Sequence, residues 1–393
     1  MLEFNVSREI AILPLSLYTL GFTIGPVISA PLSELYGRRI IYWTTMLLLV
    51  VFTGIASVSN SIGMLIAFRF LAGMGGSGAL AVGAGTISDL WDMKSEAGRA
   101  ALFYTIAPFL GPTLGPLTGA YIIDQYHNDW RYTIYVIMII AAPIAFMACF
   151  MKETSGSRVL YLRSKNSMDT VAHIEDDTML LICKLKASLL RPVQMMFLEP
   201  LVALLSIYTA FAFAMMFSFF GSFLGILVGF LLAIASFGIF NATLFRKAGI
   251  KAKGRPAPEH RLYASMLGSI MLPIGLFWFA WSPRKDVHWI VPVLGGVPFG
   301  WGCLAIFISA ITYIVEVYTA DISASAVAAN GILRYCFGAA FPLFTLQMYE
   351  KLGIQWAGSL FGFVALAMLP VPWAFFKYGS VLRKRSRYET RES

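Results

Sequence analysis

The sequence predicts an all-α, polytopic membrane protein whose helices form two bundles. Apolar residues make up 58% of the 393 residues and charged residues only 13%, about half of the roughly 25% found in soluble proteins. The charged residues gather in short segments between long apolar runs. A helix needs about 20 apolar residues to cross a bilayer, and these runs are long enough. A soluble domain of this length would need more charge to cover its surface, so lipid must cover it instead.

Eleven apolar runs are long enough to be membrane spans. In chain order they lie near residues 10–32, 40–58, 62–90, 101–123, 133–151, 200–221, 223–245, 262–282, 289–315, 323–347 and 353–376. The apolar stretch 200–245 counts as two spans because basic segments flank both of its ends, and an even number of crossings keeps both flanks on one side. The turn between these two spans has room only around Gly221–Gly225.

The charges of the loops predict which ends of the spans face the cytoplasm. Basic or mixed segments recur at Arg38-Arg39, Lys94–Arg99, 152–199, Arg246–Arg261 and from Lys377 onward. The connections between them carry little positive charge, and cytoplasmic loops are enriched in Lys and Arg. We therefore expect the basic segments and the carboxyl end inside, and the amino end outside. The net charge of +9 fits loops beside anionic lipid better than a nucleic-acid partner.

A polar stretch divides the chain into two helical halves. We expect an N-terminal half at 1–151, a central cytoplasmic loop at 152–199, a C-terminal half at 200–376 and a basic cytoplasmic tail at 377–393. Two helical halves joined by a long cytoplasmic loop are typical of pseudo-symmetric secondary transporters. The loop ends in Lys184–Arg191, which we expect to form a short amphipathic helix on the inner leaflet.

The strongest local pattern lies in the fourth run. Two stripes of a helix repeat every fourth residue there, namely Gly111, Gly115 and Gly119 and, beside them, Pro108, Pro112 and Pro116. Glycines at this spacing let another helix approach closely in lipid, and each proline removes a backbone hydrogen bond and bends the helix. Ordinary helix packing would explain a single repeat, whereas interleaved Gly and Pro repeats favour a pliable, kinked gating helix.

A second pattern runs from the first span into a short basic loop. Glu34 lies near the membrane surface, where a carboxylate can face a helix N-terminus or nearby guanidinium groups. Gly37 permits a tight turn, and Arg38 and Arg39 hold the loop on the cytoplasmic side. Asp89 ends the third run and is close enough in the topology to join this charge cluster. A generic positively charged turn explains the segment equally well.

Two arginines lie inside apolar runs, where charge is costly and usually lines an interior cavity. Arg69 lies about two turns from its helix start, so its side chain could also extend to the nearer surface. Arg334 is deeper, with Asn330 one turn before it on the same face, and we consider both as candidates for the transport pathway. Few carboxylates lie clearly within a span, so no proton carrier stands out.

Enzymatic and metal sites find little support in the sequence. The four cysteines have no paired spacing, so neither a disulfide framework nor a zinc site follows. The segment His173–Asp177 has metal-ligand residue types, but one histidine in a loop fixes no geometry, and a solvated acidic turn is favoured. No catalytic set recurs at one membrane depth, so we predict that the protein is not an enzyme and needs no cofactor or metal.

These segments, in this order, resemble the major facilitator superfamily, and within it the fungal-type drug:proton antiporters that include polyamine and multidrug exporters. Ala30–Arg39 looks like the loop motif of the superfamily, with Glu34 as its acid, and Phe68–Gly73 looks like its arginine motif. Gly111–Pro116 is similar to the antiporter motif, and Ala328–Arg334 also looks like that group. The resemblance implies two pseudo-symmetric helical halves with twelve spans, of which about eleven are present and the first is missing.

The resemblance further implies a secondary active transporter that exports drugs, toxins or polyamines by alternating access. The proton gradient would be its energy source, with Arg69 contributing to proton coupling. We expect a monomer whose partners are the lipid bilayer and a small-molecule substrate. The plasma membrane is the expected location, with the vacuolar membrane second. Two alternatives are a truncated, transport-inactive family member and a facilitated uptake carrier for a small solute.

Overall fold

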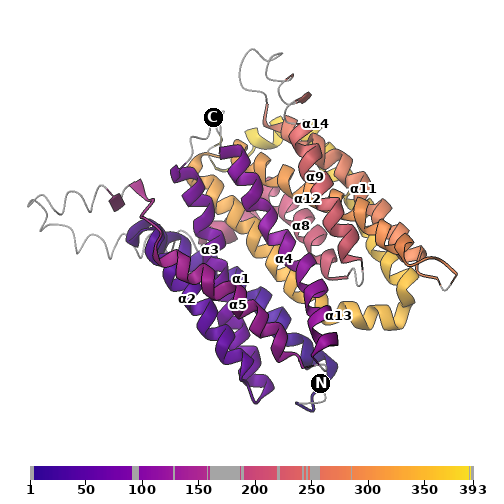
Figure 1. The fold of residues 1–393 in the computed structure, drawn as a ribbon. Coiled ribbons are helices and arrows are strands. Elements are labelled where there is room, and N and C mark those ends of the chain that lie inside the picture. Colours follow the sequence, from indigo (N-terminus) through magenta and orange to yellow (C-terminus); the bar gives the residue numbers. More distant parts are fainter. Residues whose placement is uncertain are drawn as a thin grey trace, which may run out of the picture. The chain divides into compact units, whose positions relative to one another are not determined.

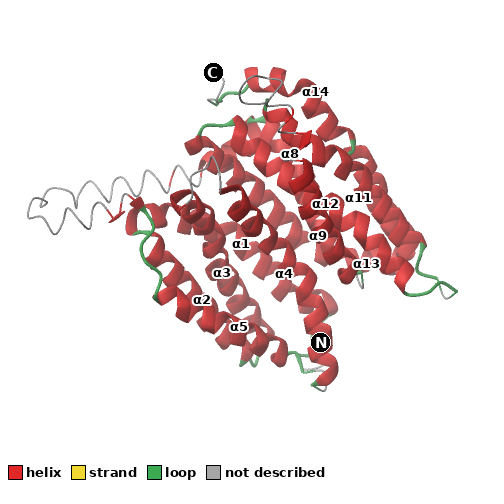
Figure 2. Ribbon diagram, turned by 45° about the horizontal axis from the view of Figure 1, so that its top comes forward, coloured by secondary structure: helices red, strands yellow, loops and turns green. Residues whose placement is uncertain are grey.

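The fold is almost wholly helical in the part of the chain that the structure describes (Figure 2). The structure, a computed structural model, describes residues 4–90, 97–126, 129–156, 158–159, 186, 190–218, 222–240, 243–244, 247, 257–284, 286–388 and 390. Ten helices in this part are long and apolar enough to cross a membrane. The predicted amphipathic helix at Lys184–Arg191 lies mostly outside the described residues.

The first of two compact units consists of Met1–Ala107 and Gly119–Arg191. Its helices are α1 (Arg8–Tyr36), α2 (Arg38–Ser57), α3 (Ile62–Leu90), the two ends of α4 (Ala97–Gln125) and α5 (Arg131–Cys149). Helix α3 packs against both α1 and α2, and α5 packs on α2. These helices coincide with the first five predicted spans.

Small residues bring the backbones of these helices into direct contact. A Cβ atom added at Gly21 of α1 would lie 2.6 Å from the carbonyl oxygen of Phe70 and 2.8 Å from the amide nitrogen of Met74, both in α3. One added at Gly75 of α3 would lie 2.9 Å from the amide nitrogen of Leu49 in α2. Since lipid gives no hydrophobic drive between helices, this close packing is what holds the bundle together.

The second unit consists of Pro108–Thr118, which is the middle of α4, and Pro192–Ser393. Its elements are α8 (Pro200–Ala214), the 3₁₀ helices η1 (Met215–Ser218) and η3 (Pro258–Leu262), α9 (Phe223–Phe240), α11 (Tyr263–Trp281), α12 (Ile290–Val317), α13 (Ala320–Met368) and α14 (Pro370–Lys384). Helix α12 packs against α9 and α11, while α13 packs against α8 and α11. The apolar stretch 200–245 thus contains two helices, as predicted.

Helix α13 is divided into two arms by Gly353, which has φ 73° and ψ 165° and breaks the helical geometry. An unbroken helix of its 49 residues would be about 74 Å long at roughly 1.5 Å per residue, more than twice the thickness of a hydrocarbon core of about 30 Å. Figure 1 shows α13 and α14 in the orange and yellow of the C-terminal part of the chain. The predicted spans 323–347 and 353–376 lie on either side of Gly353. The sequence-based prediction of a multi-pass helical membrane protein is therefore confirmed.

Candidate functional site

The turn between α1 and α2 is a single residue, Gly37. Its φ of 97° lies in the region that L side chains rarely adopt. A Cβ atom here would also collide with the carboxylate of Glu153, whose Cδ would be only 2.8 Å away. Glycine is therefore required at this position for two reasons: its backbone conformation suits only glycine, and the carboxylate of Glu153 leaves no room for a side chain.

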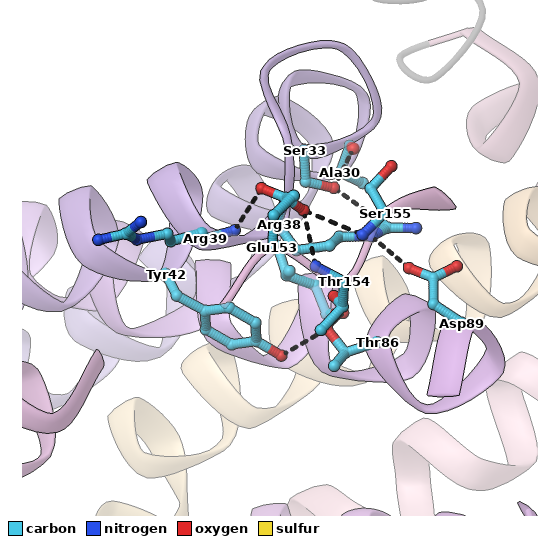
Figure 3. A network of polar contacts seen from close by, with 11 residues as sticks. Ala30, Ser33, Arg38, Arg39, Tyr42, Thr86, Asp89, Glu153, Thr154 and Ser155 are labelled. Atoms are coloured by element: carbon cyan, nitrogen blue, oxygen red, sulfur yellow. Dashed lines mark hydrogen bonds and ion pairs between the residues drawn. The ribbon is translucent and has the colours of Figure 1, made fainter. Parts of the chain in front are cut away.

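Glu153, in the segment after α5, accepts hydrogen bonds from several backbone amides (Figure 3). The amide nitrogens of Arg38 and Arg39 lie 2.8 and 3.3 Å from its carboxylate oxygens. Those of Thr154 and Ser155 both lie 3.0 Å from Oε1. The first two amides begin α2, where unpaired N–H groups and the helix dipole favour a negative charge. Glu153 thus caps α2 from a distant part of the chain.

The side chains of the two arginines tie neighbouring helices to this cap. Arg38 Nε donates to Asp89 Oδ2 at the end of α3, 3.1 Å away, and Arg38 Nη1 donates to Ser33 Oγ in α1, 2.6 Å away. Arg39 Nη2 donates to the carbonyl oxygen of Cys149 in α5 over 3.1 Å. We call Ser33, Arg38, Arg39, Asp89 and Glu153 the loop network. It joins four helices at the end of the unit predicted to face the cytoplasm.

The predicted charge cluster at this turn included Glu34, Arg38 and Asp89. The structure brings Arg38 and Asp89 together. The side chain of Glu34, in the last turn of α1, lies outside the described residues. Sequence reasoning missed Glu153, the carboxylate that contacts both arginine amides. The available signal was its position directly after the fifth span, at the same predicted membrane surface as Asp89.

Arg69 lies in α3 and its guanidinium faces the ring of Tyr18 in α1. The guanidinium carbon is 5.1 Å from the centre of the ring, a distance typical of a cation–π contact. The contact holds the positive charge against α1.

Helix α4 passes through Pro108, Pro112 and Pro116 as one continuous helix. Its glycine stripe is open, because no described atom lies within 4 Å of a Cβ added at Gly111, Gly115 or Gly119. The close approach of another helix, predicted from this spacing, is therefore not seen along the stripe in this structure.

Phe109 anchors α4 to the second unit from a different face of the helix. Its side chain is 1% exposed, and its ring centre lies 4.6 Å from that of Phe307 and 5.7 Å from those of Phe213 and Phe230. Thr113, one turn later on the same face, is fully buried. Two residues rotate a helix by about 200°, so Gly111 and Gly115 lie opposite this anchored face.

The second unit has its own polar network at the ends of its helices. Arg261 in η3 donates from Nε and Nη2 to Glu316 Oε1 at the end of α12, over 2.8 and 2.6 Å. Glu259 in η3 forms an ion pair with Arg383 of α14, and both side chains are less than one tenth exposed. The pairs Arg38–Asp89 and Arg261–Glu316 each join a basic residue before one helix to an acid at the end of another, as expected for pseudo-symmetric halves.

The carboxyl tail also joins this network. The amide nitrogen of Arg387 lies 3.3 Å from Glu199 Oε2 before α8, and Thr390 forms a β-bridge with Tyr318 after α12. Burial, followed by the nearby Glu199 carboxylate, raises the pKa of Tyr318 well above its usual 10.0, so its hydroxyl stays protonated. Sequence reasoning missed the pairing of Glu316 with Arg261.

Arg334 of α13 is buried among aromatic rings in the second unit. Its side chain is 7% exposed, and its guanidinium carbon lies 4.5 Å from the ring centre of Phe307, 4.7 Å from that of Tyr335 and 5.5 Å from that of Phe213. Nη2 donates to the hydroxyl of Tyr335 at 3.0 Å. Nε and Nη1 are buried without a hydrogen-bond partner among the described residues. We call these four residues the arginine cluster.

Asn330 lies one turn before Arg334 and is fully buried. Its Nδ2 donates to Thr209 Oγ1 in α8 over 2.7 Å, while its Oδ1 has no hydrogen-bond partner in the described structure. Both residues predicted as pathway candidates are thus interior polar groups with unused hydrogen-bonding capacity.

Comparison with known proteins places this architecture in a family. The chain matches the family model described as the Major Facilitator Superfamily over residues 1–342. The efflux pump FUB11 of Gibberella moniliformis is 37% identical over 414 residues, which cover 98% of this chain and 69% of that protein. The multidrug transporter mdrA of Aspergillus fumigatus is 36% identical, covering 98% and 67%. Polyamine transporter 4 of Saccharomyces cerevisiae is 34% identical, covering 98% and 65%.

Solved structures share the fold at low sequence identity. The xylose transporter XylE from E. coli superposes with a TM-score of 0.60 at 17% identity, covering 94% of this chain and 90% of that one. The human organic anion transporter MFSD10 superposes with a TM-score of 0.55 at 15% identity, covering 92% and 83%. The matched family model and relatives more than 30% identical over nearly the whole chain show that this multi-pass membrane protein is a transporter of the major facilitator superfamily.

Proposed function

We propose that the chain exports small organic compounds by alternating access, with the proton gradient as its energy source. The observation that carries the proposal is the construction of α4, which is anchored by Phe109 on one face and open along its glycine stripe on the other. The names of several relatives that are called efflux pumps, among them FUB11 of Gibberella moniliformis, support export over uptake.

The residues of α4 suit a helix that changes its neighbours during transport. Pro112 and Pro116 lack amide hydrogens, so the helix can bend there without losing a hydrogen bond. Gly111 and Gly115 leave room for another helix to approach in one conformation and withdraw in the other. Alternating access would rock the two halves about a central substrate site, and the loop network would open and close with each cycle.

Arg69 is the residue we propose for proton coupling. A guanidinium does not release its proton at physiological pH, so Arg69 cannot itself carry the proton. Its role would be electrostatic, because a fixed positive charge within the membrane lowers the affinity of a nearby group for protons. We propose the plasma membrane as the location, because export from the cell requires it.

Export is tested in cells that lack their own drug pumps. Cells that express the chain should retain less of the fluorescent compounds rhodamine 6G and Nile red than cells with an empty vector, and a protonophore should remove the difference. Equal retention with and without the chain would contradict export. Faster uptake in counterflow, with no net export, would instead indicate a facilitated carrier.

A further inference from the structure

Among α8, α9, α11, α12 and the arm of α13 before Gly353, one charged residue lies away from the helix ends, and that residue is Arg334. Helices α8, α9 and α11 contain no Asp, Glu, Lys or Arg at all. Glu316 lies at the end of α12, Asp321 lies in the first turn of α13, and Glu350 and Lys351 lie beside the Gly353 break of α13. The membrane interior of this unit therefore has a positive charge and no acidic residue to neutralise it.

The surroundings of Arg334 only partly compensate for its burial. The faces of Phe213, Phe307 and Tyr335 interact favourably with a cation, but a ring face accepts no ordinary hydrogen bond. Two of the guanidinium nitrogens lack a hydrogen-bond partner in the part of the chain that the structure describes. Buried charges in proteins are normally both paired and hydrogen-bonded, because an unpaired one is strongly destabilising. The arginine cluster thus has unused donors for an anion that the helices of this unit do not supply.

We propose that the arginine cluster recognises the carboxylate of an exported aromatic or amphipathic organic acid. A planar carboxylate accepts two parallel hydrogen bonds from one edge of a guanidinium, so it would pair with Nη2 and with either Nε or Nη1, the two nitrogens that are unpaired here. The rings of Phe213 and Phe307, with Phe109 packed against both, provide an apolar wall for the rest of the molecule. Asn330 Oδ1, one turn away on α13, is a second unused polar atom that can accept a hydrogen bond from the same ligand.

The same charge argues against a polyamine in this unit. The ammonium groups of a polyamine bind to carboxylates or to the faces of aromatic rings. The interior of these helices has no Asp or Glu, and the guanidinium of Arg334 already occupies the ring faces. Arg334 would repel an ammonium group in a medium of low dielectric constant. This assignment names a substrate class for the proposed export function. Transport of the acid depends on that function, whereas binding of the acid at Arg334 does not.

Binding to the purified full chain in lipid nanodiscs tests the proposal directly. The probes are 4-phenylbutyrate and its uncharged amide, 4-phenylbutyramide, which have the same size and the same ring. At neutral pH the acid is ionised, and we expect it to bind at least about tenfold more tightly than the amide, as a charge-assisted pair provides. Equal affinity for acid and amide would overturn the proposal, and this result needs no variant that must fold.

Variants then assign the preference to one side chain. Arg334→Gln should remove the preference for the acid, and Arg334→Lys should keep a reduced preference because it retains the charge but loses the planar fork. Arg131→Gln is the matched control, because Arg131 is an arginine of the first unit that contacts Asp129 and the carbonyl oxygen of Ser59. An equal loss of preference in Arg131→Gln would overturn the assignment to Arg334.

Export of Nile red, measured with the same proteins, separates this inference from the proposed function. If the chain exports Nile red but binds the acid no better than the amide, the inference fails and the proposed function stands. If it binds the acid in preference but exports no compound, the anion site stands and the export function fails.

Discussion

Gly37 and Glu153 show how a single residue position depends on a distant one. The backbone of Gly37 adopts a φ of 97°, and the carboxylate of Glu153 occupies the space of a side chain there. The two features have different causes, since one is a property of the turn and the other comes from a residue more than a hundred positions later. Adding a single methyl group at Gly37 therefore tests the loop network.

Gly37→Ala should destabilise the protein by about 1–3 kcal/mol, because alanine is strained at this φ and its methyl group displaces Glu153 from the start of α2. Thermal unfolding in detergent measures the effect. Gly63→Ala is the matched control, since Gly63 is helical and has no described atom within 4 Å of an added Cβ. Similar unfolding temperatures of Gly37→Ala and Gly63→Ala would contradict the interpretation that the turn requires glycine at position 37.

Glu153→Gln should weaken the cap of α2, because an amide accepts a hydrogen bond from a helix N-terminus without contributing a charge. We expect the amides of Arg38 and Arg39 to exchange hydrogen faster, with a loss of protection of about 1–2 kcal/mol. Hydrogen exchange followed by mass spectrometry measures this on peptides that cover the start of α2. Asp124→Asn, on an exposed residue near the end of α4, is the control and should leave that segment unchanged.

At the scale of the element, the two faces of α4 differ in their contacts. Phe109 and Thr113 are buried in the second unit, whereas the stripe of Gly111, Gly115 and Gly119 contacts no described atom within 4 Å of an added Cβ. The sequence predicts the stripe correctly as a geometric feature of one helix. The glycine spacing does not specify whether a neighbouring helix occupies the stripe.

Gly115→Val should slow export severalfold while the protein still folds, since a branched side chain fills the stripe only when another helix approaches it. The rate of Nile red export from expressing cells, corrected for the amount of protein in the membrane, measures the change. Ala120→Val, on an exposed position of the same helix outside the Gly/Pro pattern, is the control. If both valine variants export at the wild-type rate, α4 does not gate transport through this stripe.

At the scale of the whole molecule, each unit ends in a polar network that joins several helices. In the first unit the carboxylate of Glu153 provides the connection, and in the second the tail provides it through Arg383 and Arg387. The Glu259–Arg383 pair is buried, so the loss of one partner would leave the other charge without compensation.

Arg383→Met should therefore destabilise the protein by about 3–5 kcal/mol, and adding Glu259→Gln to it should restore part of that loss, because the second change removes the uncompensated charge. Thermal unfolding of the single and double variants measures the coupling. Lys384→Met, on the exposed neighbour of Arg383, should have little effect. A double variant less stable than Arg383→Met would show that the pair does not act as a unit.

The sequence by itself determined that the chain is a multi-pass helical membrane protein with two halves, because long apolar runs can be stable only as helices in lipid. It also located the turn at Gly37, the repeated Gly and Pro pattern of α4 and the two arginines within apolar helices, since each depends on residues close together in the chain. Proton coupling through Arg69 remains a prediction of this kind.

Only the tertiary structure decided which partner each polar group has. Glu153 binds amides 114 and 115 residues away, Arg261 binds Glu316, and Arg334 lies among aromatic rings with two nitrogens unpaired. Hydrogen bonds act over about 3 Å, so they depend on how helices distant in the chain are brought together, and a linear pattern does not contain that information.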